Sequence, residues 1–279
     1  MRWQGGRQGG NVEDRRGLSG RAAGGGIGVV VLALIGYFVF GISPETTQQV
    51  ASQLGGVGAS VEGKTGTPAD EAGRFVDVIG ANINDVWTAK LKGYTPPKVV
   101  IYEQGTPTGC GFGQAAMGPF YCPADATVYV DLGFWTEMET KLGASGADFA
   151  RAYVIAHEFG HHVQSLTGAA QKVAQAREVG EAEGNRASVA LELQADCYAG
   201  VWAAGASAVS GGKVALESGD LEEGLKTANA IGDDRLQQRS TGQVMPEKFT
   251  HGSSAQRMEW LQRGYRSGDP AQCGTFAAR

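Results

Sequence analysis

The chain has 279 residues, 42% of them apolar, and this length fits one domain of ordinary size with an appendage. Its 24 basic and 29 acidic residues give a formal net charge of −5. Because five arginines are concentrated in residues 1–21, the remainder is clearly acidic, and such a domain is not expected to bind nucleic acid.

Three segments are predicted to precede the folded domain. Residues 1–21 are rich in Gly, Arg and Gln and lack a hydrophobic pattern, so they are expected to be a disordered tail. Residues 22–43 carry no charge and are just apolar and long enough for a transmembrane helix. A buried core helix and a cleaved signal peptide are the alternatives. Residues 44–70, rich in Ser, Thr, Gln, Gly and Pro, are predicted to be a flexible linker.

The arginines predict an orientation for this span. All five arginines of residues 1–21 precede the span, and Lys64 is the single basic residue between the end of the span and residue 70. Because basic residues stay on the cytoplasmic side, the tail is expected in the cytoplasm and residues 71–279 outside it. The chain is then predicted to be a single-pass protein of the cytoplasmic membrane with an extracytoplasmic, periplasmic domain.

The domain is predicted to open with a helix and a small sheet. Apolar residues recur at helical spacing from about residue 71 to Leu91, before two prolines. Residues 99–102 are typical of a strand, and residues 105–132 contain short β-prone pieces separated by glycines. A further helix is expected over residues 132–142.

The next helix is expected to start at Asp148 and carries a His-Glu-x-x-His motif. Residues four apart lie on one helix face, so His157 and His161 can point both imidazoles at one ion. Glu158 can reach a water there without being a ligand. Two such ligands with a neighbouring base are typical of zinc hydrolases. The alternative, a solvated helix, is disfavoured by the apolar flanks, and Gly160 is interpreted as allowing close packing near the ion.

A second helix, expected over residues 185–208, offers a third ligand. Glu192 lies on its apolar inner side, and Asp196 is four residues on, hence on the same face. We predict Glu192 as the third zinc ligand, with a fourth position left open for water. Asp196 is predicted to accept the free ring N–H of a ligand histidine and so to fix its tautomer. An exposed charged face is the alternative.

Three more helices are expected, over residues 169–183, 220–236 and 254–266. The first is polar and rich in alanine, and it is interpreted as a surface helix or as a lid over the cleft. The last is amphipathic, so its apolar side is expected to face the core. With the short strands, these helices predict a mainly helical α+β domain over residues 71–279.

Four cysteines in an exported domain predict two disulfides. A bond between Cys110 and Cys122 would close a short loop. A bond between Cys197 and Cys273 would attach the C-terminal tail to the Glu192 helix. Zinc ligation by thiolates is the alternative, but no two cysteines have Cys-x-x-Cys spacing.

Together these motifs resemble a known family. His-Glu-x-x-His followed by Glu192-x-x-x-Asp196 is similar to the gluzincin metallopeptidases, whose third ligand is a glutamate. The whole chain, through residues 157–164, 192–197 and 250–254, resembles the bacterial putative neutral zinc metallopeptidase family. The resemblance implies a zincin-like domain with one zinc ion per chain and a membrane-anchored peptidase acting on proteins or peptides, without implying a particular substrate.

The resemblance also suggests how substrate is held. In zincins a sheet edge beside the metal helix pairs with the extended substrate backbone, and residues 128–132 or 111–117 could supply it, unless they form an ordinary internal hairpin. His251 resembles the downstream His…Arg signature of membrane-bound gluzincins, with Gly252 where those usually have proline. We interpret His251 as a hydrogen-bond donor to the oxyanion, or else as a packing residue, and we expect Arg257 to pair with a buried carboxylate.

The predicted function is zinc-dependent hydrolysis of peptide bonds with Glu158 as the general base and the zinc held by His157, His161 and Glu192. Two alternatives stay open. The chain could be a catalytically silent adaptor or binding module that retains a metallopeptidase fold at the membrane, or a hydrolase of cell-wall peptides. The sequence carries no signal for an oligomeric state.

Overall fold

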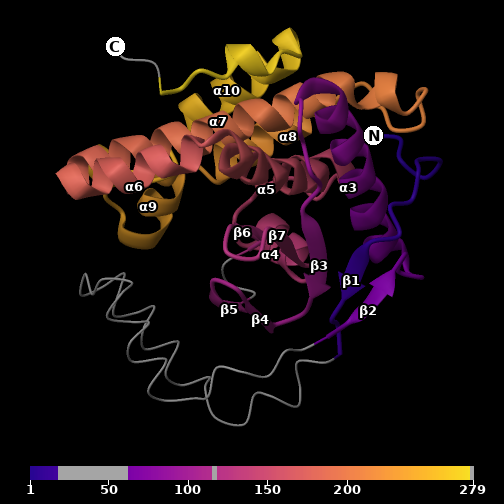
Figure 1. Ribbon diagram of the computed structural model, residues 1–279. Coiled ribbons are helices and arrows are strands. Elements are labelled where there is room, and N and C mark those ends of the chain that lie inside the picture. The colour runs from indigo at the N-terminus through magenta and orange to yellow at the C-terminus, as the bar shows by residue number, and fades with distance from the viewer. Residues whose placement is uncertain (18–61, 115–117, 277–279) are drawn as a thin grey trace.

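A computed structural model describes residues 1–17, 62–114 and 118–276 of the chain (Figure 1). The predicted span at residues 22–43 lies outside these described residues. The elements follow one another as β1 (Val12–Asp14), β2 (Lys64–Gly66), α3 (Glu71–Lys90), β3 (Lys98–Tyr102), β4 (Gly105–Thr108), β5 (Gly111–Gln114), β6 (Phe120–Cys122), β7 (Thr127–Asp131), α4 (Phe134–Thr140), α5 (Asp148–Thr167), α6 (Ala169–Val179), α7 (Glu181–Val209), α8 (Asp220–Ala230), α9 (Asp233–Thr241), η2 (Pro246–Lys248), α10 (Ser254–Ser267) and η3 (Pro270–Gln272).

Five short strands form one sheet in the order β2-β1-β3-β7-β6. The three inner strands are parallel to one another, whereas β2 and β6 run antiparallel at the two edges. Along β3, Val99 and Ile101 join the main core and Val100 and Tyr102 join a second cluster, because successive side chains of a strand point to opposite faces. The β4–β5 hairpin is separate. Since β7 is an inner strand, the prediction that residues 128–132 form a free edge is wrong.

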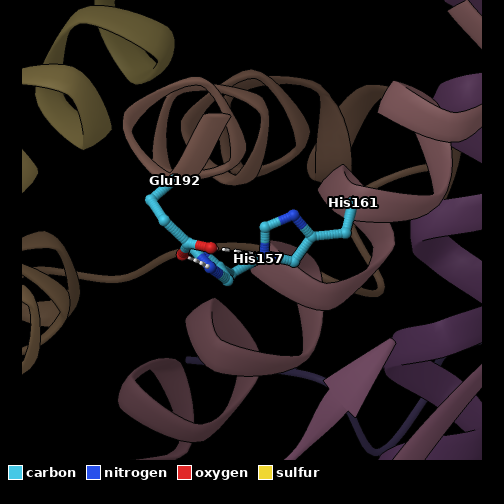
Figure 2. A group of neighbouring side chains, drawn as sticks. All are labelled: His157, His161 and Glu192. Atoms are coloured by element: carbon cyan, nitrogen blue, oxygen red, sulfur yellow. Dashed lines mark hydrogen bonds and ion pairs between the residues drawn. The ribbon is translucent and has the colours of Figure 1, made fainter. Parts of the chain in front are cut away.

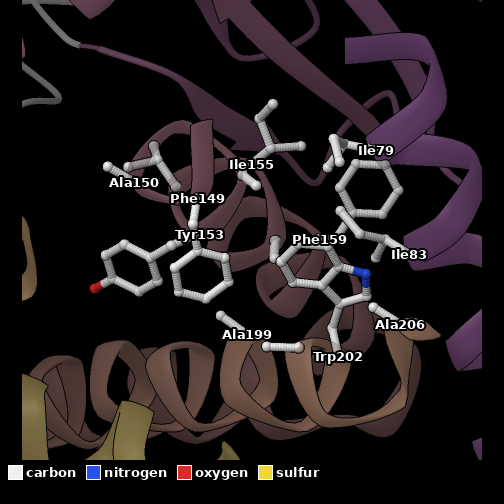
Figure 3. Packing of buried hydrophobic residues seen from close by; sticks show 14 of the residues in the cluster. Ile79, Ile83, Phe149, Ala150, Tyr153, Ile155, Phe159, Ala199, Trp202 and Ala206 are labelled. Atoms are coloured by element: carbon white, nitrogen blue, oxygen red, sulfur yellow. The ribbon is translucent and has the colours of Figure 1, made fainter. Parts of the chain in front are cut away.

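Helices form the larger part of the domain and pack in layers on one side of the sheet (Figure 1). Helix α5 lies between the sheet and the long helix α7, with α3 beside it and α10 on the outer side of α7. Figure 3 shows side chains of α3, α5 and α7 meeting in the core, among them Ile79, Ile83, Phe149, Phe159 and Trp202. The structure therefore confirms the mainly helical α+β prediction.

Two glycine contacts set the spacing of these helices. A Cβ on Gly160 of α5 would lie 3.1 Å from the Cα of Ala195 on α7, so the glycine lets the two backbones approach closely. Between α7 and α10, a Cβ on Gly264 would lie only 1.9 Å from the carbonyl oxygen of Cys197. The close packing predicted for Gly160 is confirmed, and it falls within the motif helix.

The prediction of a disordered tail over residues 1–21 is wrong for residues 1–17. Trp3 is 4% exposed and its Nε1 donates a hydrogen bond to Asp148 Oδ2 at 2.9 Å, at the start of α5. Strand β1 pairs with β2 on one side and β3 on the other, so β2 also orders part of the predicted linker. Arg16 forms an ion pair with Asp70. Every one of these partners lies far along the chain, which is why local composition did not predict the order.

The predicted membrane topology is also wrong. Among residues 1–17, 62–114 and 118–276, no helix combines the length and apolarity needed to cross a bilayer. Moreover, β1 and β3 are hydrogen-bonded neighbours in one sheet. Residues 12–14, predicted to be cytoplasmic, and residues 99–101, predicted to be outside, therefore lie on the same side of any membrane.

The helix predicted over residues 220–236 is two helices, α8 and α9, separated at Ile231 and Gly232. A Cβ on Gly232 would lie 2.3 Å from the backbone nitrogen of Ser254, so only glycine fits at this crossing. The break turns Asp233 toward the loop at residues 250–252, where it accepts backbone hydrogen bonds.

Both predicted disulfides are present. Cys110 bonds to Cys122 and Cys197 bonds to Cys273, with Cα–Cα distances of 5.8 and 5.6 Å. Two disulfides are typical of proteins that fold in an oxidising compartment. The second bond ties the chain beyond α10 to α7, the helix that carries Glu192 and Asp196.

Candidate metal centre

Two imidazoles project from one face of α5 into a common space. His157 and His161 lie one turn apart, with ring centroids 4.7 Å apart and ring planes at 90°. His157 is 6% exposed and His161 is partly buried. The helix holds both residues rigidly because its buried face, which includes Tyr153 and Phe159, is anchored in the core.

Glu192 of α7 faces both imidazoles (Figure 2). Its Oε2 lies 3.1 Å from His157 Nε2 and its Oε1 lies 3.5 Å from His161 Nε2. One donor atom from each of the three residues lies within 4.8 Å of the others. The structure thus brings together the three residues that the sequence predicted as ligands, from two different helices.

Asp196 orients His157 from behind. Its Oδ1 lies 2.8 Å from His157 Nδ1 and also accepts a hydrogen bond from the hydroxyl of Tyr153 at 2.6 Å. Arg257 of α10 donates to both carboxylate oxygens, from Nε at 2.8 Å and from Nη2 at 3.0 Å. The expected pairing of Arg257 with a buried carboxylate is confirmed, and this pairing stabilises the charge of a fully buried Asp196.

The charges around His157, His161 and Glu192 favour a cation among them. Burial alone would lower the pKa of His157, but the neighbouring carboxylates of Asp196 and Glu192 outweigh it and raise this pKa to about 10. Burial alone would raise the pKa of Glu192, yet the two imidazoles hold it well below its usual range. The site therefore stabilises positive charge at the Nε2 atoms, where a metal would sit.

A zinc ion fits this donor set. The Nδ1 atoms of His157 and His161 lie against hydrogen-bond acceptors, Asp196 Oδ1 and Gln164 Oε1, so each ring hydrogen is held on Nδ1. A metal would take the place of the Nε2 protons, so both imidazoles would present their Nε2 lone pairs to it, beside the oxygens of Glu192. Two imidazole nitrogens with one carboxylate are ligands that zinc prefers.

Glu158 lies next to the ligand His157 in the chain and lines a cleft with it. It is 7% exposed, and burial raises the pKa of its carboxyl group above the ordinary value, against the opposing effect of the two histidines. A carboxylate with a raised pKa is a stronger proton acceptor than an exposed one.

His251 reaches the same cleft from the loop before α10. Its Nδ1 lies 3.1 Å from Asp233 Oδ1, and the backbone N–H groups of Thr250, His251 and Gly252 all donate to Asp233 Oδ2 at 2.7 to 3.0 Å. The ring hydrogen on Nδ1 is thereby directed to the aspartate. Nε2 is left as the atom available to a ligand in the cleft.

The cleft has a volume of about 550 Å³ and a mixed lining. Its polar lining residues are Tyr153, His157, Glu158, His161, Glu192, His251 and Arg257. Its apolar lining residues are Phe134, Met138, Leu142, Val154, Ile231 and Leu236. Residues 118–121, leading into β6, complete the lining, whereas no residue of α6 contributes among those described.

Sequence reasoning missed three residues that support this site: Tyr153, Gln164 and Asp233. Tyr153 precedes His157 by one helical turn, so its place on the ligand face could have been read from spacing. Gln164 follows His161 by three residues, which carries the same signal. Asp233 gave no such signal because it meets His251 only through the break between α8 and α9.

The comparisons with known proteins agree with this chemistry. A family model described as "putative neutral zinc metallopeptidase" matches residues 1–276. Uncharacterized protein YpfJ of Escherichia coli strain K12 is 50% identical, over 99% of this chain and 99% of that protein. Uncharacterized protein Rv2575 of Mycobacterium tuberculosis strain H37Rv is 45% identical, over 75% of this chain and 73% of that protein. No solved structure matches significantly.

Proposed function

The chain belongs to the putative neutral zinc metallopeptidase family, and from this premise we propose that it hydrolyses peptide bonds with one zinc ion held by His157, His161 and Glu192. The observation that supports this most directly is the convergence of the three donor groups beside the buried carboxyl group of Glu158. Three protein ligands leave a fourth position for water or substrate, as catalytic zinc sites do.

Zinc bound there would lower the pKa of a water molecule and polarise the carbonyl group of the scissile bond. The chain's own residues prepare the site for it. Asp196 holds His157 with Nε2 directed toward Glu192, and Glu192 supplies one negative charge against the two of the metal. Asp196 forms an ion pair with Arg257, so its buried carboxylate has a partner while it accepts the Nδ1 hydrogen of His157.

Glu158 is proposed as the general base. Its carboxylate takes a proton from the attacking water and passes it to the leaving nitrogen, so one residue serves as base and then as acid. The raised pKa that burial gives this carboxyl group suits both steps, since a group that binds a proton too weakly could not deliver it to the amine.

His251 is proposed to stabilise the oxyanion. Its Nδ1 hydrogen is directed to Asp233, so its Nε2 can donate a hydrogen bond only when the ring carries both protons. Partial desolvation in the cleft would lower the pKa of His251, but the carboxylates of Asp233 and Glu192 outweigh it and raise this pKa. The aspartate therefore favours the doubly protonated ring that this role requires.

Protein or peptide is the proposed substrate, held in an extended form along β6. This strand is an edge of the described sheet, antiparallel to β7, and residues 118–121 line the cleft. An edge strand can pair with any extended backbone, because the hydrogen bonds involve main-chain groups only. This proposal places the substrate-binding edge at β6 and not at the two segments expected from the sequence.

The test uses the purified full chain and the variant Glu158→Gln. The wild-type chain should contain about one zinc per molecule, should cleave casein, and should lose this activity to a chelator and regain it with zinc. Glu158→Gln should keep the zinc and lose hydrolysis by about 10²–10⁴-fold. Wild-type rates in this variant would contradict the proposal.

The same preparation separates the alternatives. A wild-type chain that binds zinc and cleaves cell-wall peptides but not casein would be a hydrolase of another amide class. A chain that binds a peptide without cleaving either would be an adaptor.

A further inference from the structure

The two histidines of the metal centre are supported from behind in chemically different ways. His157 donates to a carboxylate, whereas His161 Nδ1 lies 2.9 Å from the amide oxygen of Gln164. Gln164 is 0% exposed and lies on α5, three residues after His161. The second support is therefore a neutral, fully buried amide.

The orientation of the Gln164 amide is determined by its other partners. Its Nε2 donates to the carbonyl oxygen of Leu191 at 2.6 Å and to Gln194 Oε1 at 3.1 Å. Turning the amide over would place its oxygen against two acceptors in a buried space, without a donor for any of them there. Gln164 Oε1 therefore faces His161, the ring hydrogen lies on Nδ1, and Nε2 keeps its lone pair toward Glu192.

Gln194 fixes this arrangement from one step further away. It is 8% exposed, and its Nε2 donates to the carbonyl oxygen of Cys273 at 2.9 Å. This bond requires Gln194 Oε1 to face Gln164. Cys273 is held in turn by its disulfide to Cys197 on α7. Two amides thus connect His161 to the chain segment that follows α10.

We propose that Gln164 and Gln194 are positioning residues that hold His161 in the tautomer with Nε2 free for the metal. The inference rests on the proposed function, because that function supplies the zinc. It predicts an effect on metal binding itself, which can be measured without any substrate. Removing an outer hydrogen bond to a ligand histidine typically weakens metal affinity 10–100-fold.

A purely structural role for these amides would give a different result, and Asn82 offers the matched control. It is 3% exposed, its Nδ2 donates to the carbonyl oxygen of Ala206 at 3.1 Å, and its Oδ1 accepts from Trp202 Nε1 at 2.8 Å. This amide joins α3 to α7 through two buried hydrogen bonds, and neither partner is a residue of the metal centre.

The experiment is a competition titration of zinc against a chelator, with the full chain and the variants Gln164→Met, Gln194→Met and Asn82→Leu. We expect zinc affinity to fall about 10–100-fold in Gln164→Met and by a smaller factor in Gln194→Met, which keeps the bond to His161. Asn82→Leu should lower the melting temperature and leave zinc affinity unchanged.

Several outcomes would overturn the inference. An unchanged affinity in Gln164→Met, or an equal loss in Asn82→Leu, would reduce the amides to ordinary packing groups. Should Gln164→Met not fold, Gln194→Met provides the test, because it keeps the bonds of Gln164 to His161 and Leu191 and is the milder change. Zinc affinity equal to that of the wild type in Gln194→Met would then overturn the inference. A wild-type chain that binds no zinc would instead contradict the proposed function, so the two failures are distinguishable.

Discussion

Two histidines of the cleft are each paired through Nδ1 with an aspartate, and the two pairs lie in opposite surroundings. His157 and Asp196 are buried at 6% and 0% exposure. The side chain of His251 is 51% exposed, although its partner Asp233 is largely buried. The same hydrogen bond is thus made once in the core and once at the rim.

What compensates each carboxylate also differs. Asp196 is matched by the guanidinium of Arg257 and the hydroxyl of Tyr153, both supplied by side chains of neighbouring helices. The charge of Asp233 is compensated by three backbone N–H groups of the loop at residues 250–252, which contains His251. The buried pair can only hold a ligand in place, because any change of charge there would leave an ion unpaired. The rim pair can gain or lose a proton to solvent.

The largest expected effect comes from Asp196→Ala. It would leave the buried guanidinium of Arg257 without its partner, at a cost of about 3–5 kcal/mol in the free energy of unfolding. It would also release the ring of His157, so zinc affinity should fall about 10–100-fold. Urea unfolding of the zinc-loaded chain and chelator titration measure the two effects.

Asp233→Ala is the matched variant of the rim pair. It leaves three backbone donors without their carboxylate, at a cost of about 1–3 kcal/mol, and should not change zinc affinity. Asp85, the exposed ion-pair partner of Arg7, offers a control: Asp85→Ala should lower the free energy of unfolding by about 0.5 kcal/mol or less. If Asp233→Ala weakened zinc binding as much as Asp196→Ala, the two pairs would not differ as argued.

The next effect is on turnover and comes from the rim alone. His251→Ala should lower kcat on a peptide substrate by about 10²–10³-fold, the usual result of removing one oxyanion donor. Zinc affinity should stay at the wild-type value because His251 is not among the three converging donors. Steady-state kinetics at saturating zinc give the first quantity. An unchanged kcat would leave His251 as a packing residue, the alternative reading of the sequence.

The two pairs also differ in how far the sequence predicted them. Asp196 was predicted as the partner of a ligand histidine because His157, Glu192 and Asp196 lie on two regular helices, where spacing fixes the face. Asp233 was not predicted, because it reaches His251 through a helix break that depends on the crossing of Gly232 and Ser254. Helical periodicity carries information within one element and none about where two elements meet.

The same reason accounts for what the sequence predicted wrongly elsewhere. The boundaries of α3, β3 and α5 follow from apolar spacing and from breaks at prolines or Gly168, whose φ of 78° favours glycine. The order of residues 1–17 could not be predicted, because Trp3 and β1 are held by Asp148 and β3, far along the chain. Local composition there indicated disorder since the stabilising partners are not local.

The smallest effect is a shift in pH dependence, and it tests whether the rim pair titrates. Burial raises the pKa of Glu158, which must be ionised to act as base, so kcat/KM should fall on the acid side as this group is protonated. Asp233 raises the pKa of His251, which must be protonated to donate from Nε2, so kcat/KM should fall on the basic side as the ring loses its proton.

Asp233→Asn keeps an acceptor but removes the negative charge, so the pKa of His251 should fall and the basic limb should move to lower pH. The acid limb should stay where it is, since Asp233 is not among the groups that shift the pKa of Glu158. A basic limb that did not move would show that another group titrates there, and the rim pair would then be as static as the buried one.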